Sequence, residues 1–361
     1  MDKRIQNLAK ILVKYSIKAQ EKEEIVIRGS YEAKDLIHSV YEELIKAGSY
    51  PKIKLQMPGA AYSFYKYAKD HQLDFVSDID YLEAEKIAAL IGIKSDLNTK
   101  ELSNIDPALM TRTQKAGEKL KKRIIERVRW NVTLFPTNAL AQDAEMSLSE
   151  YEDFVYKACF ADQDDPIACW EELSRKQQKL CDFFNKGTEL RIVGPDTDIS
   201  MNVGGRTFIN SDGTHNMPSG EIFSAPVEAS VNGHISYDFP VCLMGKEVNG
   251  VRLEFRDGRV ENFSATKNQD FLEAMLNTDG GARFLGEIGI GNNFGIDRFT
   301  KNILFDEKIG GSIHLALGQS YEECGGKNVS AIHWDMIKDL RQGGQLYLDG
   351  QLVQENGKFL V

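Results

Sequence analysis

The sequence predicts an α/β N-terminal domain with a mostly parallel sheet, followed by an α+β, mostly antiparallel β C-terminal domain. The chain has 361 residues, more than one hydrophobic core usually organises, so two domains are expected. The first half alternates helical and strand patterns, whereas the second half shows short alternating strands separated by Gly-containing turns. We place the boundary between Lys186 and Gly187, which gives domains of residues 1–186 and 187–361.

The N-terminal half follows a β-α-β rhythm. Apolar residues recur at helical spacing from Ile5 to Val13 and from Leu36 to Ile45, and short apolar runs mark the strands. The predicted elements are helices at 5–13, 36–45 and 107–128 and strands at 25–27, 53–55, 87–93 and 130–135. This alternation implies a largely parallel sheet covered by helices. Residues 148–186 are expected to form two helical pieces that separate near Asp165 and Pro166.

From Thr188 onward the pattern changes to strand-like alternation, beginning with Leu190 and Ile192. Four dipeptides predict hairpin turns: Gly204-Gly205, Asp212-Gly213, Asn249-Gly250 and Asp257-Gly258. One helix is expected from about Gln269 to Leu276. The second domain is therefore predicted to be mostly antiparallel.

Composition and charge exclude several classes of protein. The net charge of −10 argues against nucleic acid and against an anionic membrane surface as partners. The five cysteines are scattered and contain no Cys-x-x-Cys pair, so we expect reduced thiols in a cytoplasmic protein. The N-terminus lacks the apolar stretch of a signal peptide, and no run approaches the roughly 18 apolar residues of a membrane span.

Three carboxylates and two imidazoles in the C-terminal half form a candidate metal site. They are Glu221, Glu287, His314, His333 and Asp335. Between residues 312 and 318, the apolar residues share one strand face and His314 shares the other with small residues. Between residues 331 and 337, His333 and Asp335 project together from the face opposite to the apolar one. Such a set can hold two divalent ions and thereby support metal-assisted hydrolysis.

Each of these residues also has an ordinary structural interpretation. A single strand histidine is often packed or solvated, a His-x-Asp pair is often local, and Glu221 lies next to a turn. Gly286 and Gly289 clear space beside Glu287, but that residue could also be a plain turn glutamate. The linear sequence does not show that the four segments meet, so the prediction depends on the whole set. The chain contains no phosphate loop, Gly-x-Ser-x-Gly elbow or His-Glu-x-x-His helix.

These segments resemble the aminopeptidase T / aminopeptidase S family of metallopeptidases. The likeness covers most of the chain and is strongest after residue 188. The matching blocks are Asn216–Pro226, Leu285–Gly289, His314–Gly318 with Tyr321, and His333–Asp335, together with Leu190–Pro195 and Met146–Leu148. The resemblance implies two divalent metal sites, hydrolysis at peptide N-termini, and a homodimer with an enclosed cavity.

The same resemblance assigns roles to individual residues. By matching position, it implies that the metal ligands are Glu221, Glu287, His314, His333 and Asp335. Tyr321 would be a ligand or a catalytic hydroxyl, although a tyrosine at a strand end can also simply pack its ring. The connection from Tyr321 to His333 is compact, so cavity shape and substrate preference do not follow from the likeness.

The predicted function is a metal-dependent aminopeptidase that releases N-terminal residues through a water activated by two metal ions. Glu221 or Glu287 would carry the proton to the leaving amine, and Tyr321 would donate a hydrogen bond to the oxyanion. Zn²⁺, Co²⁺, Mn²⁺ and Mg²⁺ all suit such ligands, and the sequence does not choose among them. Two alternatives stay open: another dinuclear metal amidohydrolase, and a non-enzymatic binding protein that contains a metal.

Overall fold

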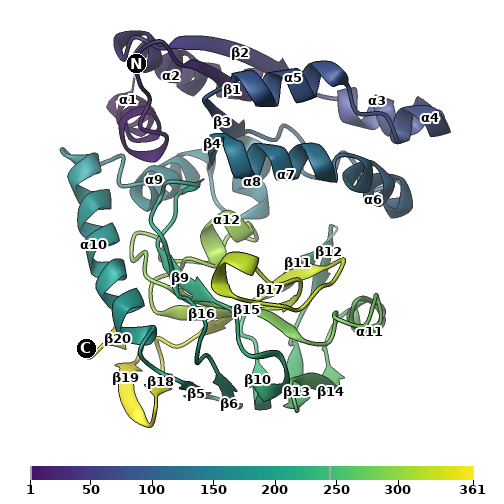
Figure 1. The fold of residues 1–361 in the computed structure, drawn as a ribbon, viewed down its shortest axis with the longest axis vertical. Helices are drawn as coiled ribbons and strands as arrows, with labels where there is room; N and C mark the ends of the chain where they lie inside the picture. The colour runs from purple at the N-terminus through teal and green to yellow at the C-terminus, as the bar shows by residue number, and fades with distance from the viewer. Residues whose placement is uncertain (1, 244) are drawn as a thin grey trace. The chain divides into compact units, whose positions relative to one another are not determined.

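The computed structural model describes residues 2–243 and 245–361 (Figure 1). The chain divides into two compact units. The first comprises the chain up to Trp170 together with Gly213–Pro218, and the second comprises Glu171–Asp212 with Ser219–Val361. The domain boundary between residues 186 and 187 stays a prediction.

A five-stranded parallel sheet forms the centre of the first unit. Its strand order is β2-β1-β3-β4-β8, and every neighbouring pair is parallel. The strands are β1 (Glu24–Ser30), β2 (Tyr50–Gln56), β3 (Ala89–Lys94), β4 (Arg129–Leu134) and β8 (Asn216–Met217). This confirms the predicted α/β N-terminal domain with its mostly parallel sheet.

The helices of this unit precede β1 or connect its strands, as β-α-β crossovers require. They are α1 (Lys3–Lys10) with a π-helical segment (Ile11–Ser16), a 3₁₀ turn (Tyr31–Ala33), α2 (Lys34–Lys46), α3 (Ala60–Tyr67), α4 (Asp70–Leu73), α5 (Asp78–Lys86), α6 (Pro107–Ala116), α7 (Glu118–Arg127), α8 (Asn138–Asp143), α9 (Leu148–Ala158) and the start of α10 (Pro166–Phe184). The helix predicted at 107–128 is two helices that meet at Gly117. The predicted break near Asp165 and Pro166 is confirmed, because α10 begins at the proline.

The second unit contains three antiparallel sheets. The strand orders are β14-β13-β10-β6-β5-β18-β19-β20, β17-β16-β15-β9-β7 and β11-β12. The bounds of the strands are β5 (Glu189–Gly194), β6 (Thr197–Asn202), β7 (Ile209–Ser211), β9 (Glu221–Ser224), β10 (Asn232–Ser236), β11 (Val241–Leu243), β12 (Lys246–Val248), β13 (Arg252–Arg256), β14 (Arg259–Ser264), β15 (Leu285–Gly291), β16 (Ser312–Gly318), β17 (His333–Asp339), β18 (Gln345–Leu348), β19 (Gln351–Glu355) and β20 (Lys358–Phe359). The helical segments are most of α10, α11 (Gln269–Leu276), α12 (Ile303–Asp306) and 3₁₀ turns at Glu228–Ser230 and Glu322–Cys324. The mostly antiparallel C-terminal domain is thereby confirmed.

The eight-stranded and five-stranded sheets share one hydrophobic core. Ile192 on β5 and Leu253 on β13 belong to the same buried cluster as Ile288 on β15, Leu315 on β16 and Trp334 on β17. Because successive side chains on a strand alternate between its two faces, burial of these residues turns the intervening residues of β15, β16 and β17 to the opposite face. That opposite face of the five-stranded sheet carries the candidate site residues.

The hairpin predictions were mostly wrong. Asp257-Gly258 does connect the antiparallel pair β13 and β14. In the described part of the chain, Gly204-Gly205, Asp212-Gly213 and Asn249-Gly250 each lie between strands that pair with other partners instead. A Gly-containing dipeptide permits a reversal of the chain, but the same local geometry also serves connections between different sheets.

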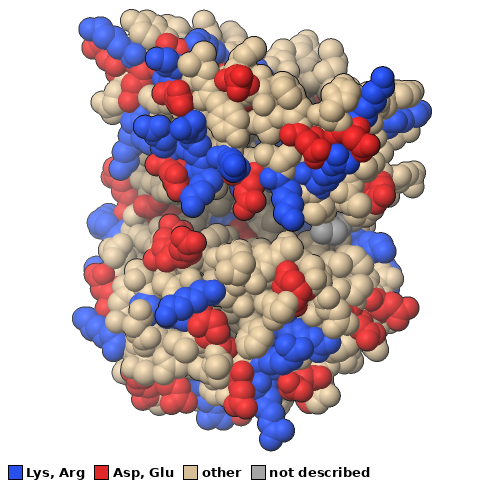
Figure 2. All heavy atoms as spheres, turned by 45° about the vertical axis from the view of Figure 1, so that its right-hand side comes forward, with Lys and Arg blue, Asp and Glu red and all other residues tan. Residues whose placement is uncertain are grey.

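The surface shown in Figure 2 carries basic and acidic side chains that are intermingled rather than separated. No helix formed by residues 2–243 or 245–361 combines the length and the hydrophobicity needed to cross a bilayer. All five cysteines are free thiols, and three of them, Cys159, Cys181 and Cys324, are buried.

Candidate metal centre

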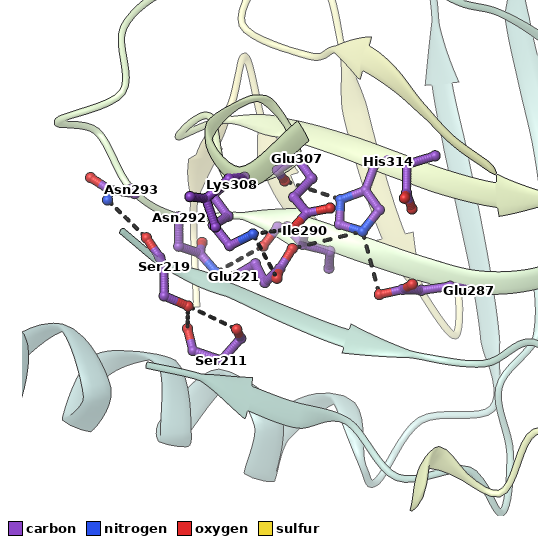
Figure 3. Close-up of polar contacts among 12 residues, drawn as sticks. Ser211, Ser219, Glu221, Glu287, Ile290, Asn292, Asn293, Glu307, Lys308 and His314 are labelled. Carbon is purple, nitrogen blue, oxygen red and sulfur yellow. Dashed lines mark hydrogen bonds and ion pairs between the residues drawn. The ribbon is translucent and has the colours of Figure 1, made fainter. Parts of the chain in front are cut away.

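Neighbouring strands of the five-stranded sheet bring all five predicted ligands into one cluster. Figure 3 shows three of them, Glu221, Glu287 and His314. Glu221 begins β9, Glu287 lies on β15, His314 lies on β16, and His333 and Asp335 lie on β17. The strand register places Ala316 opposite Glu287 on one side and opposite Asp335 on the other. A methyl group at this central position leaves room for the acidic side chains to converge above it.

Glycine positions in β15 create the space that this arrangement needs. His314 pairs with Gly289, and a Cβ atom at residue 289 would lie 2.0 Å from His314 Cε1. The imidazole ring therefore lies directly over the glycine. At Gly286 the register shifts between Leu285 and Glu287. This bulge lets Leu285 enter the hydrophobic core while Glu287 joins the polar cluster on the opposite face.

Both imidazole rings are oriented by backbone carbonyl groups. His314 Nδ1 lies 3.0 Å from the Glu307 carbonyl oxygen, and His333 Nδ1 lies 2.8 Å from the Gln319 carbonyl oxygen. Donation of the Nδ1 hydrogens to these carbonyls leaves Nε2 of each ring as the atom that faces the carboxylates. This is the usual orientation of histidines that bind a metal through Nε2.

The Nε2 atoms face oxygen atoms at distances of 3.1 to 3.7 Å. His314 Nε2 lies 3.4 Å from Glu287 and 3.7 Å from Glu221. Figure 3 marks both contacts with dashed lines. His333 Nε2 lies 3.1 Å from Glu287 and 3.5 Å from Asp335. If both rings were neutral, their Nε2 lone pairs would oppose carboxylate oxygens. The arrangement therefore requires a positive charge, either as protons on the rings or as a bound cation.

The pKa values of the two imidazoles reflect the same excess of negative charge. Burial opposes protonation of His314, yet its hydrogen bond to Glu287 and the charge of Glu221 raise its pKa to about 10. Burial likewise opposes protonation of His333, but Asp335 and Glu287 raise its pKa to about 11. The surrounding carboxylates thus stabilise a positive charge at each Nε2 position, as expected of a site that binds a cation.

The carboxylates respond in different directions. Burial raises the pKa of Glu221 above its usual value, although Lys308 and His314 act against this. For Glu287, burial is outweighed by the hydrogen bonds from the two imidazoles, which hold its pKa below the usual range. The His333 contact similarly lowers the pKa of Asp335 despite its burial.

Two groups of three residues have the spacing of metal ligands. One consists of Glu287, His333 and Asp335, and the other consists of Glu307, His314 and Asp335. In each group the ligand atoms lie within 4.8 Å of one another. Asp335 belongs to both groups.

Buried carboxylate oxygen atoms without hydrogen bonds support the same interpretation. Among the described residues, Glu221 Oε2 and Asp335 Oδ1 are buried and have no hydrogen-bond partner. Buried carboxylate oxygens are rarely left unsatisfied unless another group binds them. Oxygen and imidazole nitrogen atoms are suitable ligands for divalent ions such as Zn²⁺ or Mn²⁺. The residues present therefore fit a bound divalent metal.

Sequence reasoning missed two members of the cluster, Glu307 and Lys308. They follow α12, in a charged run that resembles a solvated loop. In the structure Lys308 is fully buried and its ammonium group contacts Glu307 and lies 3.6 Å from Glu221. Burial raises the pKa of Glu307 to about 7, with Lys308 acting in the opposite direction. The glycines at 310 and 311, directly before β16, were the available sign that this loop returns close to His314.

Tyr321 lies at the margin of the cluster. Its ring centroid is 5.2 Å from that of His333 and 5.5 Å from that of Phe223, and the residue is 42% exposed. Partial desolvation and the charges of the neighbouring carboxylates raise the pKa of its hydroxyl group. Tyr321 is thus a protonated hydroxyl on a partly exposed residue whose ring lies beside His333.

Comparison with known proteins decides the family. The sequence model of the thermophilic metalloprotease family M29 matches residues 1–359. The chain belongs to this family. The predicted resemblance to aminopeptidases T and S is thereby confirmed, and so is the expectation of a metal-dependent peptide hydrolase.

Individual relatives cover nearly the whole chain. Aminopeptidase 2 of Geobacillus stearothermophilus is 27% identical over 353 residues, which cover 89% of this chain and 84% of the relative. Aminopeptidase T of Thermus aquaticus is 26% identical over 352 residues, which cover 88% of this chain and 85% of the relative. The solved structure of AmpT from Thermus thermophilus matches with a TM-score of 0.85 at 22% identity and covers 99% of both chains, which shows a shared fold.

Proposed function

We propose that this protein is an aminopeptidase that releases N-terminal residues from peptides by means of two divalent ions held on the five-stranded sheet. The observation that carries the proposal is the pair of imidazoles whose Nε2 atoms face carboxylates 3.1 to 3.7 Å away. The names of the relatives support the choice of reaction. When bound, divalent ions polarise the scissile carbonyl group and lower the pKa of a water so that it can attack.

The geometry suggests how the ligand roles are divided. Glu287, His333 and Asp335 would hold one ion, and Glu307, His314 and Asp335 would hold the other, with Glu221 beside His314. Zn²⁺, Co²⁺, Mn²⁺ and Mg²⁺ all fit these ligand atoms. Both oxygens of Glu287 face imidazole nitrogens, so Glu287 acts as a ligand rather than as a proton carrier.

Two of the chain's own groups would move or donate protons. Glu221 Oε2 has no hydrogen-bond partner among the described residues, so it can accept a proton from the attacking water and pass it to the leaving amine. Tyr321 remains protonated and lies beside His333, so it can donate a hydrogen bond to the oxyanion. The free α-amino group of the substrate would be neutralised by the excess of carboxylates in the cluster.

A homodimer and a cytoplasmic location belong to the same proposal. On the edge strand β2, Tyr50, Ile53 and Leu55 all face solvent. An edge strand with exposed apolar side chains is a typical surface for association with another chain. Free thiols at all five cysteines fit a reducing compartment. Light scattering during gel filtration would measure the mass of the assembly, and a monomeric mass would contradict the dimer.

The test of the proposed reaction is hydrolysis of aminoacyl-p-nitroanilides and short peptides after chelation and single-metal addition. We expect release of N-terminal residues to be restored by metal and to be absent with N-acetylated substrates. Equal cleavage of acetylated substrates would instead indicate another metal amidohydrolase. Metal-dependent thermal stabilisation without turnover of any substrate would indicate a binding protein that contains a structural ion.

A further inference from the structure

A fully buried lysine lies inside the proposed metal centre. The side chain of Lys308 is 0% exposed, and its ammonium group contacts Glu307 and lies 3.6 Å from Glu221 Oε1 (Figure 3). Burial of an ammonium group is costly unless carboxylates surround it. The position of Lys308 is also fixed through its backbone, because its amide donates to the Phe305 carbonyl and its carbonyl accepts from Asn293.

The contacts of Lys308 fall on one side of the cluster. Glu307 belongs to the ligand group that contains His314, and Glu221 lies 3.7 Å from His314 Nε2. Among the described residues, no ion pair joins Lys308 to Glu287 or Asp335. The ammonium group therefore competes with a metal for the carboxylates around His314, while the carboxylate of Glu287 remains free of that competition.

The competition has an electrostatic consequence. A divalent ion bound by Glu307 and His314 would share Glu307 with a fixed positive charge. The two cations would repel each other at a distance of a few ångströms in a region of low dielectric constant, which weakens binding by at least about 100-fold. Among the described residues Lys308 forms no ion pair with the group of Glu287, His333 and Asp335, so its repulsion there is weaker and acts only through the shared Asp335.

We propose that Lys308 is a resident cation that makes the two metal positions unequal. The group Glu287, His333 and Asp335 takes the tightly held ion, and the group with Glu307 and His314 holds a second ion at least about 100-fold more weakly. This inference rests on the metal-binding role proposed above for the same residues. It implies that the chain, as isolated, is occupied mainly at the tight position, and that the second ion of the proposed reaction binds only at higher metal concentration.

The test is titration of the metal-free protein with Co²⁺ or Zn²⁺ by calorimetry, with bound ions counted by mass spectrometry after equilibrium dialysis. We expect wild type to bind one ion tightly and a second at least 100-fold more weakly. In Lys308→Met, which keeps the side-chain length but removes the charge, the two steps should come within about 10-fold of each other. Lys338→Met is the matched control: Lys338 is also buried, but its ammonium group pairs with Asp238.

Two equally tight ions in wild type would overturn the proposal, even if Lys308→Met did not fold. If folded Lys308→Met binds the second ion with wild-type affinity, the proposal is also overturned. It is overturned as well if Lys338→Met tightens binding of the second ion as much as Lys308→Met does. His314→Ala should leave the tight step intact, and His333→Ala should remove it; the reverse would contradict the assignment. Unequal binding without peptide hydrolysis would support the role of Lys308 and refute the proposed enzyme, whereas absence of any binding would refute both.

Discussion

Metal binding should release protons from the two imidazoles. In the metal-free chain the pKa of His314 is raised to about 10 and that of His333 to about 11 by the surrounding carboxylates. Both rings are therefore protonated at pH 7, and each must lose its Nε2 proton before that atom can bind a metal. We expect about one proton to be released for each imidazole that becomes a ligand, and about two when both do so.

The sign of the pH dependence follows directly. Because the metal-free state holds the protons and the metal-bound state does not, affinity must fall as the pH falls. Below about pH 10, each displaced proton lowers the apparent affinity about 10-fold per pH unit, so two protons give about 100-fold. Burial also raises the pKa of Glu307 to about 7, which adds a further fraction of a proton near neutral pH.

Isothermal titration calorimetry in buffers with different ionisation enthalpies measures this number. The slope of the observed enthalpy against the ionisation enthalpy of the buffer gives the protons released per chain. His333→Ala should lower the slope by about one proton compared with wild type. A slope near zero in wild type would refute the reasoning, because it would mean that the rings are neutral or that they do not bind the metal.

Three further predictions concern single residues. Gly289→Ala places a Cβ atom 2.0 Å from the His314 ring, so metal affinity and turnover should fall about 100-fold, whereas Gly280→Ala, with open space around it, should match wild type in both assays. Tyr321→Phe should lower kcat about 100-fold with little change in KM, because the hydroxyl contacts the oxyanion. Wild-type kinetics in this variant would mean that the Tyr321 ring only packs against its neighbours. Burial raises the pKa of Asp306 to about 7 from its usual 3.8, so the unfolded chain ionises first and stability is lost as the pH rises from about 4 to 7. In Asp306→Asn, up to about 4 kcal/mol of this pH-dependent loss in the free energy of unfolding should disappear. Urea unfolding of both proteins across this pH range measures it, and equal pH dependence of the unfolding free energy in the two proteins would contradict the prediction.

The strand alternation predicted much of the site. His314, and the pair His333 and Asp335, were assigned to the polar faces of their strands because the residues between them are apolar, and those apolar residues do lie in the core. For Glu287 simple alternation was insufficient. Leu285 lies two positions before Glu287 yet enters the core, because a bulge at Gly286 shifts the register. A bulge depends on pairing with β16, which a linear pattern does not contain.

The remaining differences have the same origin in tertiary structure. Glu307 and Lys308 lie in a charged run after a short helix, where local sequence favours a solvated loop. The chain returns to β16 directly after them, and the Glu307 carbonyl contacts His314, so Lys308 is buried and Glu307 is partly buried. The hairpin predictions were wrong at Asn249-Gly250 for a related reason: turn chemistry specifies a reversal but does not specify which strands pair.

The central claim is that the metal bound on the five-stranded sheet performs the hydrolysis. Metal content and turnover of an unblocked aminoacyl-p-nitroanilide should therefore be measured on the same preparations of wild type, Glu287→Gln and the surface control Glu261→Gln. The amide keeps the shape of Glu287 but removes the charge that faces both imidazoles. We expect Glu287→Gln to lose bound metal and to fall to background turnover, with Glu261→Gln unchanged. Wild-type metal content and turnover in folded Glu287→Gln protein would contradict the claim.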